Sequence, residues 1–183
     1  MSEEKINLAV AALRKGRMVI VTRYEGEQLS AACITPAART TPAHVNFMVS
    51  HARGLVCVAL SKLLGERLNL APQNPTSRHP RSEDVMVSVE ARKGVSTGIS
   101  AADRARTISV LGNTDTLPDD IITPGHIIPV TVSPKGVFSR WQIPEGAVDL
   151  VRLAGLAPAV AYCKMLSPEG KVMTLEEVQA TAA

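Results

Sequence analysis

Aromatic residues are scarce in this chain: Phe, Tyr and Trp together make up 3% of its 183 residues. Proteins that bind single-stranded nucleic acids stack the bases on aromatic side chains, so the sequence argues against a nucleic-acid partner. Hydrophobic residues nevertheless reach 45%, and the core must therefore consist of Val, Leu, Ile, Ala and Met. This length and hydrophobic content predict one globular domain spanning residues 1–183.

Cysteines are also few, and no hydrophobic run approaches the length of a membrane-spanning helix. Cys33, Cys57 and Cys163 lie inside apolar, strand-like runs, without the spacing of a disulfide framework or a zinc site. The N-terminus lacks a basic segment that leads into an apolar one. We therefore expect three reduced thiols, a cytoplasmic location and no membrane association.

Neither sign of charge dominates the sequence. The formal net charge is +3, from 20 Lys and Arg against 17 Asp and Glu, and the two signs are interspersed. This balance argues against a polyanion-binding tail but leaves room for a small anionic ligand.

The most informative local pattern lies between residues 93 and 108. Ser100 followed by Asp103 has the spacing of a capping box, which predicts that a helix begins there. Gly98 frees the backbone just before this helix, and Arg104 adds positive charge, so the amides of the helix start could bind an anion. Plain capping explains the same residues, because such boxes open many helices that bind nothing.

Strand-like apolar runs and amphipathic helices follow one another irregularly, without an internal repeat. One strand is expected over residues 85–91 and another over 127–132, where Pro129 predicts an edge strand or a bulge. Residues 23–30 are polar and predict a hairpin or loop. The pattern as a whole favours an α/β or α+β sandwich with a mixed sheet.

Four motifs follow one another along the second half of the chain: TGISAADR at 97–104, PGH at 124–126, KGVFSR at 135–140 and DLVRLAG at 149–155. Their residues and order closely resemble the 3,4-dihydroxy-2-butanone 4-phosphate synthase family of riboflavin biosynthesis. The resemblance implies an α/β (α+β) three-layer sandwich with a mixed sheet, and a homodimer whose active sites are shared between subunits. Family enzymes use magnesium to convert ribulose 5-phosphate, releasing one carbon as formate through enolisation and rearrangement.

The chain departs from this family at the positions that hold the metal. Relative to the family's acidic loop, Arg23 and Tyr24 stand at the paired aspartates, and Gln28 stands at the metal-holding glutamate. Ile143 stands at the second metal ligand, which is a histidine in the family. A neutral amide does not replace a carboxylate facing a hard dication. We therefore expect no metal and no other cofactor.

Five residues are candidates for chemistry, namely Glu145, His126, Glu25, Glu27 and Cys57. Glu145 matches a retained family glutamate and could shuttle a proton, or it could stabilise a helix N-terminus. His126 could act as an acid or base, or it could be a hydrogen-bonded structural residue. Glu25 and Glu27 remain in the former acidic loop, where solvated charges would also explain them. Cys57 matches a family cysteine near the active site, although most buried cysteines are inert.

Further residues are candidates for binding a small anionic metabolite. Arg140 could hold a phosphate or carboxylate as a fork, or it could form a salt bridge with Glu145 or Asp149. The other candidates lie in the helix elbow, in the former acidic loop or next to family motifs: Thr97, Ser100, Asp103, Arg104, Arg53, Trp141, Arg23, Tyr24 and Arg81. Arg81 belongs to a basic loop that is either solvated or a lid over the site.

The retained anion-binding residues and the replaced metal ligands lead to one hypothesis and two alternatives. The hypothesis is a homologue with a reassigned active site, a lyase or isomerase outside riboflavin biosynthesis. It would act without a divalent metal on a small phosphorylated or carboxylated substrate by proton abstraction. The first alternative is a non-catalytic paralogue that binds an anionic metabolite or a partner. The second is the synthase itself, which makes the riboflavin precursor and formate from ribulose 5-phosphate.

Overall fold

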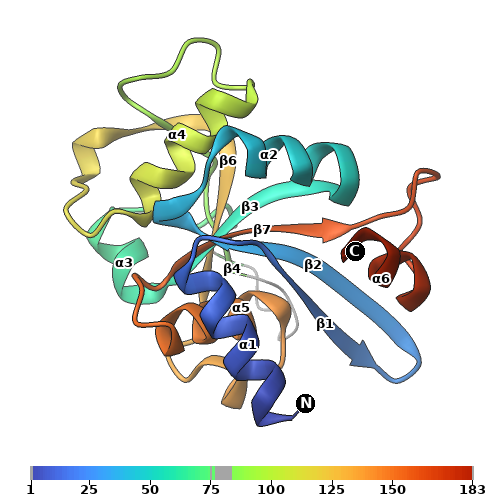
Figure 1. The fold of residues 1–183 in the computed structure, drawn as a ribbon. Helices are drawn as coiled ribbons and strands as arrows, with labels where there is room; N and C mark the ends of the chain where they lie inside the picture. The colour runs from blue at the N-terminus through green and yellow to red at the C-terminus, as the bar shows by residue number, and fades with distance from the viewer. Residues whose placement is uncertain (1, 75, 77–83, 183) are drawn as a thin grey trace.

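The computed structural model describes residues 2–74, 76 and 84–182, which form three layers with a sheet between two sets of helices (Figure 1). The helices are α1 (Glu3–Arg14), α2 (Pro42–Phe47), α3 (Lys62–Arg67), α4 (Ala101–Gly112), α5 (Ile143–Leu153) and α6 (Leu175–Ala182). The strands are β1 (Val19–Glu25), β2 (Gln28–Pro36), β3 (Arg53–Ser61), β4 (Asp84–Val85), β5 (Val89–Ala91), β6 (Ile121–Val132) and β7 (Ala159–Met165). Short helical turns are η1 (Ala37–Arg39), η2 (Met48–Ala52), η3 (Pro118–Asp120) and η4 (Gly136–Phe138). The predicted three-layer α/β sandwich is confirmed.

The sheet has seven strands in the order β1-β2-β7-β3-β6-β4, and β5 pairs with β6 outside this path. Neighbouring strands run antiparallel except β3 and β6, which are parallel. A parallel pair needs a long crossover, and the segment from α3 to α4 supplies it. The sheet is therefore mixed, as the irregular order of strand and helix patterns predicted.

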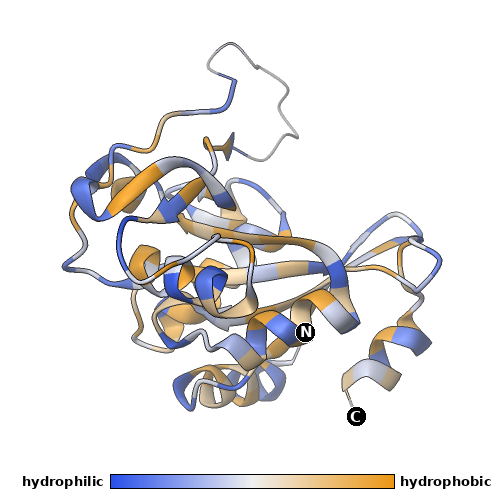
Figure 2. Ribbon diagram, turned by 90° about the horizontal axis from the view of Figure 1, so that it is seen from above, coloured by the Kyte–Doolittle hydropathy of each residue, from blue (hydrophilic) through white to orange (hydrophobic). Residues whose placement is uncertain are grey.

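Two clusters of buried aliphatic residues fill the two faces of the sheet. One lies under α2 and α4, where Met48, Ile108 and Leu111 are fully buried. The other lies over α1 and α5 and contains Leu13 and Val148. Figure 2 shows hydrophobic residues along the central strands, whereas the surrounding helices carry both hydrophobic and hydrophilic residues. Each helix thus turns an apolar side to the sheet, which is what the amphipathic patterns predicted.

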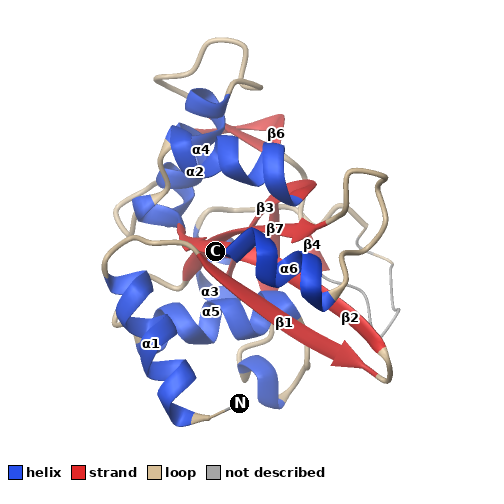
Figure 3. Cartoon of the chain, turned by 45° about the vertical axis from the view of Figure 1, so that its right-hand side comes forward, coloured by secondary structure: helices blue, strands red, loops and turns tan. Residues whose placement is uncertain are grey.

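The C-terminal helix α6 completes the first of these clusters (Figure 3), because Val178 is buried there. Thr174 caps α6: its hydroxyl accepts a hydrogen bond from the Glu177 amide, and the Glu177 carboxylate accepts one from the Thr174 amide. Among the helices that the described residues form, none has the length and apolar character needed to span a membrane.

Two local predictions are wrong. The single strand expected over residues 85–91 is two strands, because the chain leaves β6 after Val85 and pairs with it again from Val89. Pro129 marks neither an edge strand nor a bulge, since β6 lies between β3 and β4, and its pairing with β3 continues through Pro129, opposite Val58, without a register shift. β4 ends one position before it would face Pro129, a residue that has no N–H to donate. The Pro129 carbonyl instead accepts a hydrogen bond from the Met86 amide at 2.9 Å.

The polar segment at residues 23–30 forms the predicted hairpin. β1 and β2 pair from Val19 opposite Ile34 to Glu25 opposite Gln28, so that residues 26 and 27 make the turn. The paired strands therefore continue through most of the polar segment and carry its side chains to one corner of the sheet.

Candidate functional site

The elbow before α4 is organised by one carboxylate. Ser100 caps the helix, because its hydroxyl accepts a hydrogen bond from the Asp103 amide at 3.0 Å. The Asp103 side chain does not complete a capping box; it turns back and accepts hydrogen bonds from the Ser96 amide, the Ser96 hydroxyl and the Gly98 amide. These hydrogen bonds, the Ser96 hydroxyl first, lower the pKa of Asp103 below its ordinary value.

Asp103 therefore occupies the Ser96 and Gly98 amides, which precede the helix, while Ser100 takes the amide of Asp103 at the helix start itself. Thr97 is exposed beside them. Arg104 is half-buried, and its Nε has no hydrogen-bond partner within the described residues. The Asp103 carboxylate thus adds a negative charge at the elbow, and the binding of an anion by the helix start stays a prediction.

Below the elbow, His126 meets a carboxylate that the sequence did not single out. His126 Nδ1 lies 2.6 Å from Glu90 Oε2, although the two residues are 36 positions apart. Glu90 is buried in β5, whereas 41% of the His126 side chain is exposed. The pair joins β5 to β6 and leaves part of the imidazole accessible to solvent.

On the other face of the sheet, Arg140 holds Glu145 in the first turn of α5. Arg140 Nε donates to Glu145 Oε1 at 2.5 Å, and the Ser133 amide donates to the same oxygen. The remaining Arg140 nitrogens contact the Thr131 carbonyl and the Asp84 carboxylate. Glu145 is 0% exposed and lines neither of the two cavities described below. The salt bridge that the sequence offered as an alternative role for Arg140 is therefore present.

A small cavity of about 180 Å³ lies between the β1–β2 hairpin, the start of α5 and β7. Seven residues line it: Arg23, Glu25, Gln28, Ser30, Gln142, Ile143 and Lys164. Arg23 and Glu25 form an ion pair of 2.9 Å. Arg23 Nε is buried and has no hydrogen-bond partner within the described residues, so it can donate to a bound group. The cavity therefore brings together two cations, one paired carboxylate and neutral hydrogen-bonding side chains.

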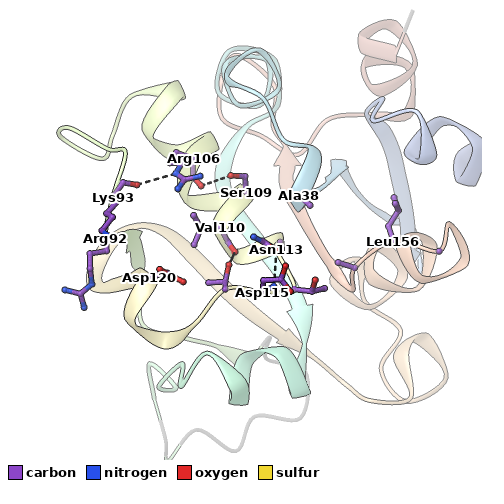
Figure 4. Close-up of a pocket in the computed structure, with 15 residues that line it drawn as sticks. Ala38, Arg92, Lys93, Arg106, Ser109, Val110, Asn113, Asp115, Asp120 and Leu156 are labelled. Atoms are coloured by element: carbon purple, nitrogen blue, oxygen red, sulfur yellow. Dashed lines mark hydrogen bonds between the residues drawn. The ribbon is translucent and has the colours of Figure 1, made fainter.

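A larger cavity of about 630 Å³ opens at the C-terminal end of α4 (Figure 4). Arg92, Lys93 and Arg106 line it together with Asp115 and Asp120, and Asp120 lies next to Arg92, whose amide donates to the Asp120 carbonyl at 2.8 Å. The side chain of Arg106 donates to the Lys93 carbonyl at 3.3 Å. None of the candidate residues predicted from the sequence lines this cavity among those that the structure describes.

The remaining candidates lie apart from both cavities. Cys57 is 7% exposed inside β3, a position that suits core packing better than nucleophilic attack. Arg53 donates to the His51 and Leu166 carbonyls and thereby ties two chain segments together. Glu27 lies in the exposed hairpin turn, and the side chains of Tyr24 and Trp141 are largely exposed. Arg81 lies outside the described residues.

Two residues of these clusters were missed in the sequence. Lys164 is an exposed charge within the otherwise buried strand β7, and Glu90 is a charge within the buried strand β5. In both cases the usable signal was a charged residue inside an apolar run, which is uncommon unless the charge has a partner or a role.

A three-layer α/β domain with a basic cavity and a paired His and Glu has the features of a small-molecule enzyme. The family model for 3,4-dihydroxy-2-butanone 4-phosphate synthase matches residues 7–183, and the chain belongs to this enzyme family.

Individual relatives agree with this assignment. The chain is 36% identical over 175 residues to the 3,4-dihydroxy-2-butanone 4-phosphate synthase of Syntrophotalea carbinolica, covering 96% of this chain and 81% of that protein. It is 40% identical over 174 residues to the riboflavin biosynthesis protein RibBA of Salinispora tropica, covering 95% of this chain but only 44% of that protein. The crystal structure of RibBX, a two-domain synthase from A. baumannii, superposes with a TM-score of 0.91 at 35% identity, covering 97% of this chain and 52% of that chain. The chain thus spans about half the length of several of these relatives.

The hypothesis of a reassigned, metal-independent lyase or isomerase is wrong on these findings. Curated relatives 35–40% identical over nearly the whole chain are named as the synthase or as riboflavin biosynthesis proteins. The replacements at Arg23, Tyr24, Gln28 and Ile143 concern one corner of the sheet. The match of the family model along residues 7–183 is a stronger guide to the reaction than these replacements.

A solved synthase that contains two magnesium ions is also similar, with a TM-score of 0.88 at 30% identity, covering 97% of this chain and 88% of that chain. Within residues 2–74, 76 and 84–182, no three His, Cys, Asp or Glu side chains gather as a metal site would require. In the small cavity, the one carboxylate, Glu25, is already paired with Arg23. The residues described here do not by themselves fit a magnesium ion, and no step proposed below passes through a metal.

Proposed function

We propose that this chain carries out the synthase reaction of its relatives, in which ribulose 5-phosphate yields 3,4-dihydroxy-2-butanone 4-phosphate and formate. The observation that carries the proposal is the small cavity at the hairpin corner. It combines the buried, unpartnered Nε of Arg23 with Lys164 and the neutral side chains of Gln28 and Ser30. A phosphate group suits these donors, because charge-assisted hydrogen bonds to its oxygens are strong.

Glu25 is the group in this cavity that can take a proton. Its carboxylate lines the cavity and lies 2.9 Å from the Arg23 guanidinium. A substrate phosphate that pairs with Arg23 would compete with Glu25 for the same cation. Release of Glu25 from its ion pair on substrate binding would place a carboxylate next to the sugar for enolisation.

The buried pair of Arg140 and Glu145 supports the cavity from behind. It fixes the first turn of α5 and therefore the positions of Gln142 and Ile143, which line the cavity. We assign this pair a structural role in the site, because Glu145 is fully buried and its Oε1 accepts from both Arg140 and Ser133.

We also propose that the active form is a homodimer. The small cavity, at about 180 Å³, falls below the roughly 300–1,000 Å³ of most small-molecule sites. The pair of His126 and Glu90 lines neither cavity within one chain. A second copy that presents its His126 to the small cavity would complete both features, and the family resemblance implies a homodimer whose active sites are shared between subunits.

The test is to incubate the protein with ribulose 5-phosphate, with added Mg²⁺ and separately with EDTA, and to follow formate. We expect formate from the unmodified chain. Arg23→Met removes the buried donor and is expected to raise KM about 10- to 100-fold, since a hydrogen bond to a charged group contributes about 1.5–3 kcal/mol. Arg152→Met, on the exposed side of α5, is the matched control and is expected to leave KM unchanged. Absence of formate under both conditions would overturn the proposal.

A further inference from the structure

The pair of Glu90 and His126 differs from an ordinary surface ion pair in its geometry. The Glu90 side chain is 9% exposed and lies 2.6 Å from one ring nitrogen, Nδ1, of His126. The imidazole is 41% exposed. No further hydrogen bond to the ring is found among the residues that the structure describes. One nitrogen of the ring is therefore engaged below the surface, while Nε2 remains available.

The Glu90 carboxylate is held on its other sides as well. Its Oε1 accepts a hydrogen bond from the Thr107 hydroxyl of α4 at 3.4 Å, and that hydroxyl accepts one from the Ala91 amide at 3.1 Å. Gly98, at φ +83°, packs directly on the carboxylate, and a Cβ at this position would overlap it. Glu90 therefore has little freedom to turn away from His126.

The donor and acceptor properties of the two groups then determine the state of the ring. An ionised carboxylate only accepts hydrogen bonds, so Nδ1 must carry the proton of the short contact. In the neutral ring, Nε2 then holds a lone pair and can accept a proton. A second residue that orients the imidazole in this way is a recurring arrangement around acid–base histidines.

We propose that Glu90 is a positioning residue, which holds His126 in its Nδ1–H form so that Nε2 serves as a second acid–base group of this enzyme, in addition to Glu25. The proposal rests on the proposed function for its chemical consequence, but not for the hydrogen-bonded geometry. Gly98 contributes by letting the elbow before α4 close over the carboxylate. The elbow motif at residues 97–104 thus helps to orient a histidine of β6.

The direct test is to determine the tautomer of His126. Long-range ¹H–¹⁵N spectra of protein labelled at its four histidines distinguish protonated from unprotonated ring nitrogens, and His126→Gln assigns the signals of His126. We expect the neutral ring to carry its proton on Nδ1 in the unmodified protein. Glu90→Gln, whose amide can donate as well as accept, is expected to move the proton to Nε2 or to give a mixture. Glu66→Gln replaces an exposed carboxylate on α3 and is expected to leave the spectrum unchanged.

The second arm measures turnover. Glu90→Gln is expected to lower kcat of formate release about 10- to 100-fold, a part of the effect of general acid–base catalysis, with KM within about threefold. Glu66→Gln should retain full kcat. If the unmodified chain releases no formate, the proposed function fails, and the tautomer measurement decides the positioning role alone.

Two results would overturn the positioning role. One is a neutral His126 that carries its proton on Nε2 in the unmodified protein, because Glu90 would then be the donor. The other is a Glu90→Gln variant whose His126 signals match those of the unmodified protein. Circular dichroism of the variant shows whether the fold is retained. Should Glu90→Gln fail to fold, the tautomer of the unmodified protein remains decisive.

Discussion

Two buried glutamates lie on opposite sides of the sheet and are held in different ways. Glu145, in α5, accepts hydrogen bonds from the Arg140 guanidinium and the Ser133 amide and is fully buried. Glu90, in β5, contacts a half-exposed histidine under the elbow before α4. Both carboxylates have partners, but a guanidinium only donates hydrogen bonds, whereas an imidazole can both donate and accept them.

This difference separates a pair that only stabilises the structure from a pair that includes a possible acid–base group. Arginine stays protonated under all conditions in which the protein folds, so the pair of Arg140 and Glu145 is a constant charge arrangement. It fixes the start of α5 beside the small cavity. The pair of Glu90 and His126 instead presents a titratable group at the surface. Burial of a carboxylate therefore does not identify a catalytic residue; the nature of its partner does.

The largest effect on stability is expected from breaking the pair of Arg140 and Glu145. Arg140→Met removes the cation and leaves Glu145 buried without its partner, and this is expected to lower the free energy of unfolding by about 3–5 kcal/mol. Urea denaturation at pH 7 measures the change. Lys62→Gln removes an exposed ion pair with Glu66 and should cost less than about 1 kcal/mol.

The double variant Arg140→Met with Glu145→Leu tests the reason for this loss. Removing both charges relieves the unpaired carboxylate, so the double variant is expected to be more stable than Arg140→Met alone. If the single replacement costs under about 1 kcal/mol, the contrast between the two glutamates is broken, because Glu145 would not depend on Arg140.

The next largest loss of stability is expected at Gly98, and it tests how tightly the Glu90 carboxylate is held. Gly98→Ala places a methyl group against the Glu90 carboxylate at φ +83°, and it is expected to cost about 2–3 kcal/mol. Gly155→Ala is the matched control: its φ is +70°, but within the described part of the chain no atom beyond its two sequence neighbours lies within 4 Å of the new Cβ. It should therefore cost only the backbone strain, about 1 kcal/mol. Equal losses would show that the carboxylate moves aside freely and that Gly98 matters only for its backbone conformation.

The parts of this structure that depend on nearby residues could be predicted from the sequence. The caps at Ser100 and Thr174 involve partners three positions away, so a short pattern contains all the information. The mixed sheet and the three layers followed from the order of the motifs and from the family resemblance. The break between β4 and β5 could not be predicted, because it depends on where the partner strand β6 pairs with each.

The site was harder to predict because its contacts join distant segments. Glu90 and His126 are 36 positions apart, and Arg140 reaches Asp84 across 56 positions. Lys164 enters the small cavity only because β7 lies beside β2 in the sheet. The replacements in one hairpin point away from the synthase reaction, whereas the similarity along residues 7–183 points to it, and a few local residues are the weaker guide.

The smallest effect on stability is expected at Asp103. After Glu145 and Glu90 it is the third carboxylate considered, and it is held by hydrogen bonds alone. The Ser96 hydroxyl, and then the Ser96 and Gly98 amides, lower its pKa below the ordinary value of 3.8. A lowered pKa in the folded state means that the ionised form stabilises the fold above the ordinary pKa. This stabilisation is lost as the pH falls through the lowered value.

Asp103→Asn is therefore expected to lower the urea midpoint at pH 7, and the difference from the unmodified protein should shrink below pH 3.8. Asp115→Asn, at an exposed position after α4, is the control and should leave the midpoint unchanged. A difference that persists at the lowest pH at which the protein still folds would mean that Asp103 acts through shape rather than charge. The elbow over Glu90 would then be held by packing, as the core is, and not by the ionised carboxylate.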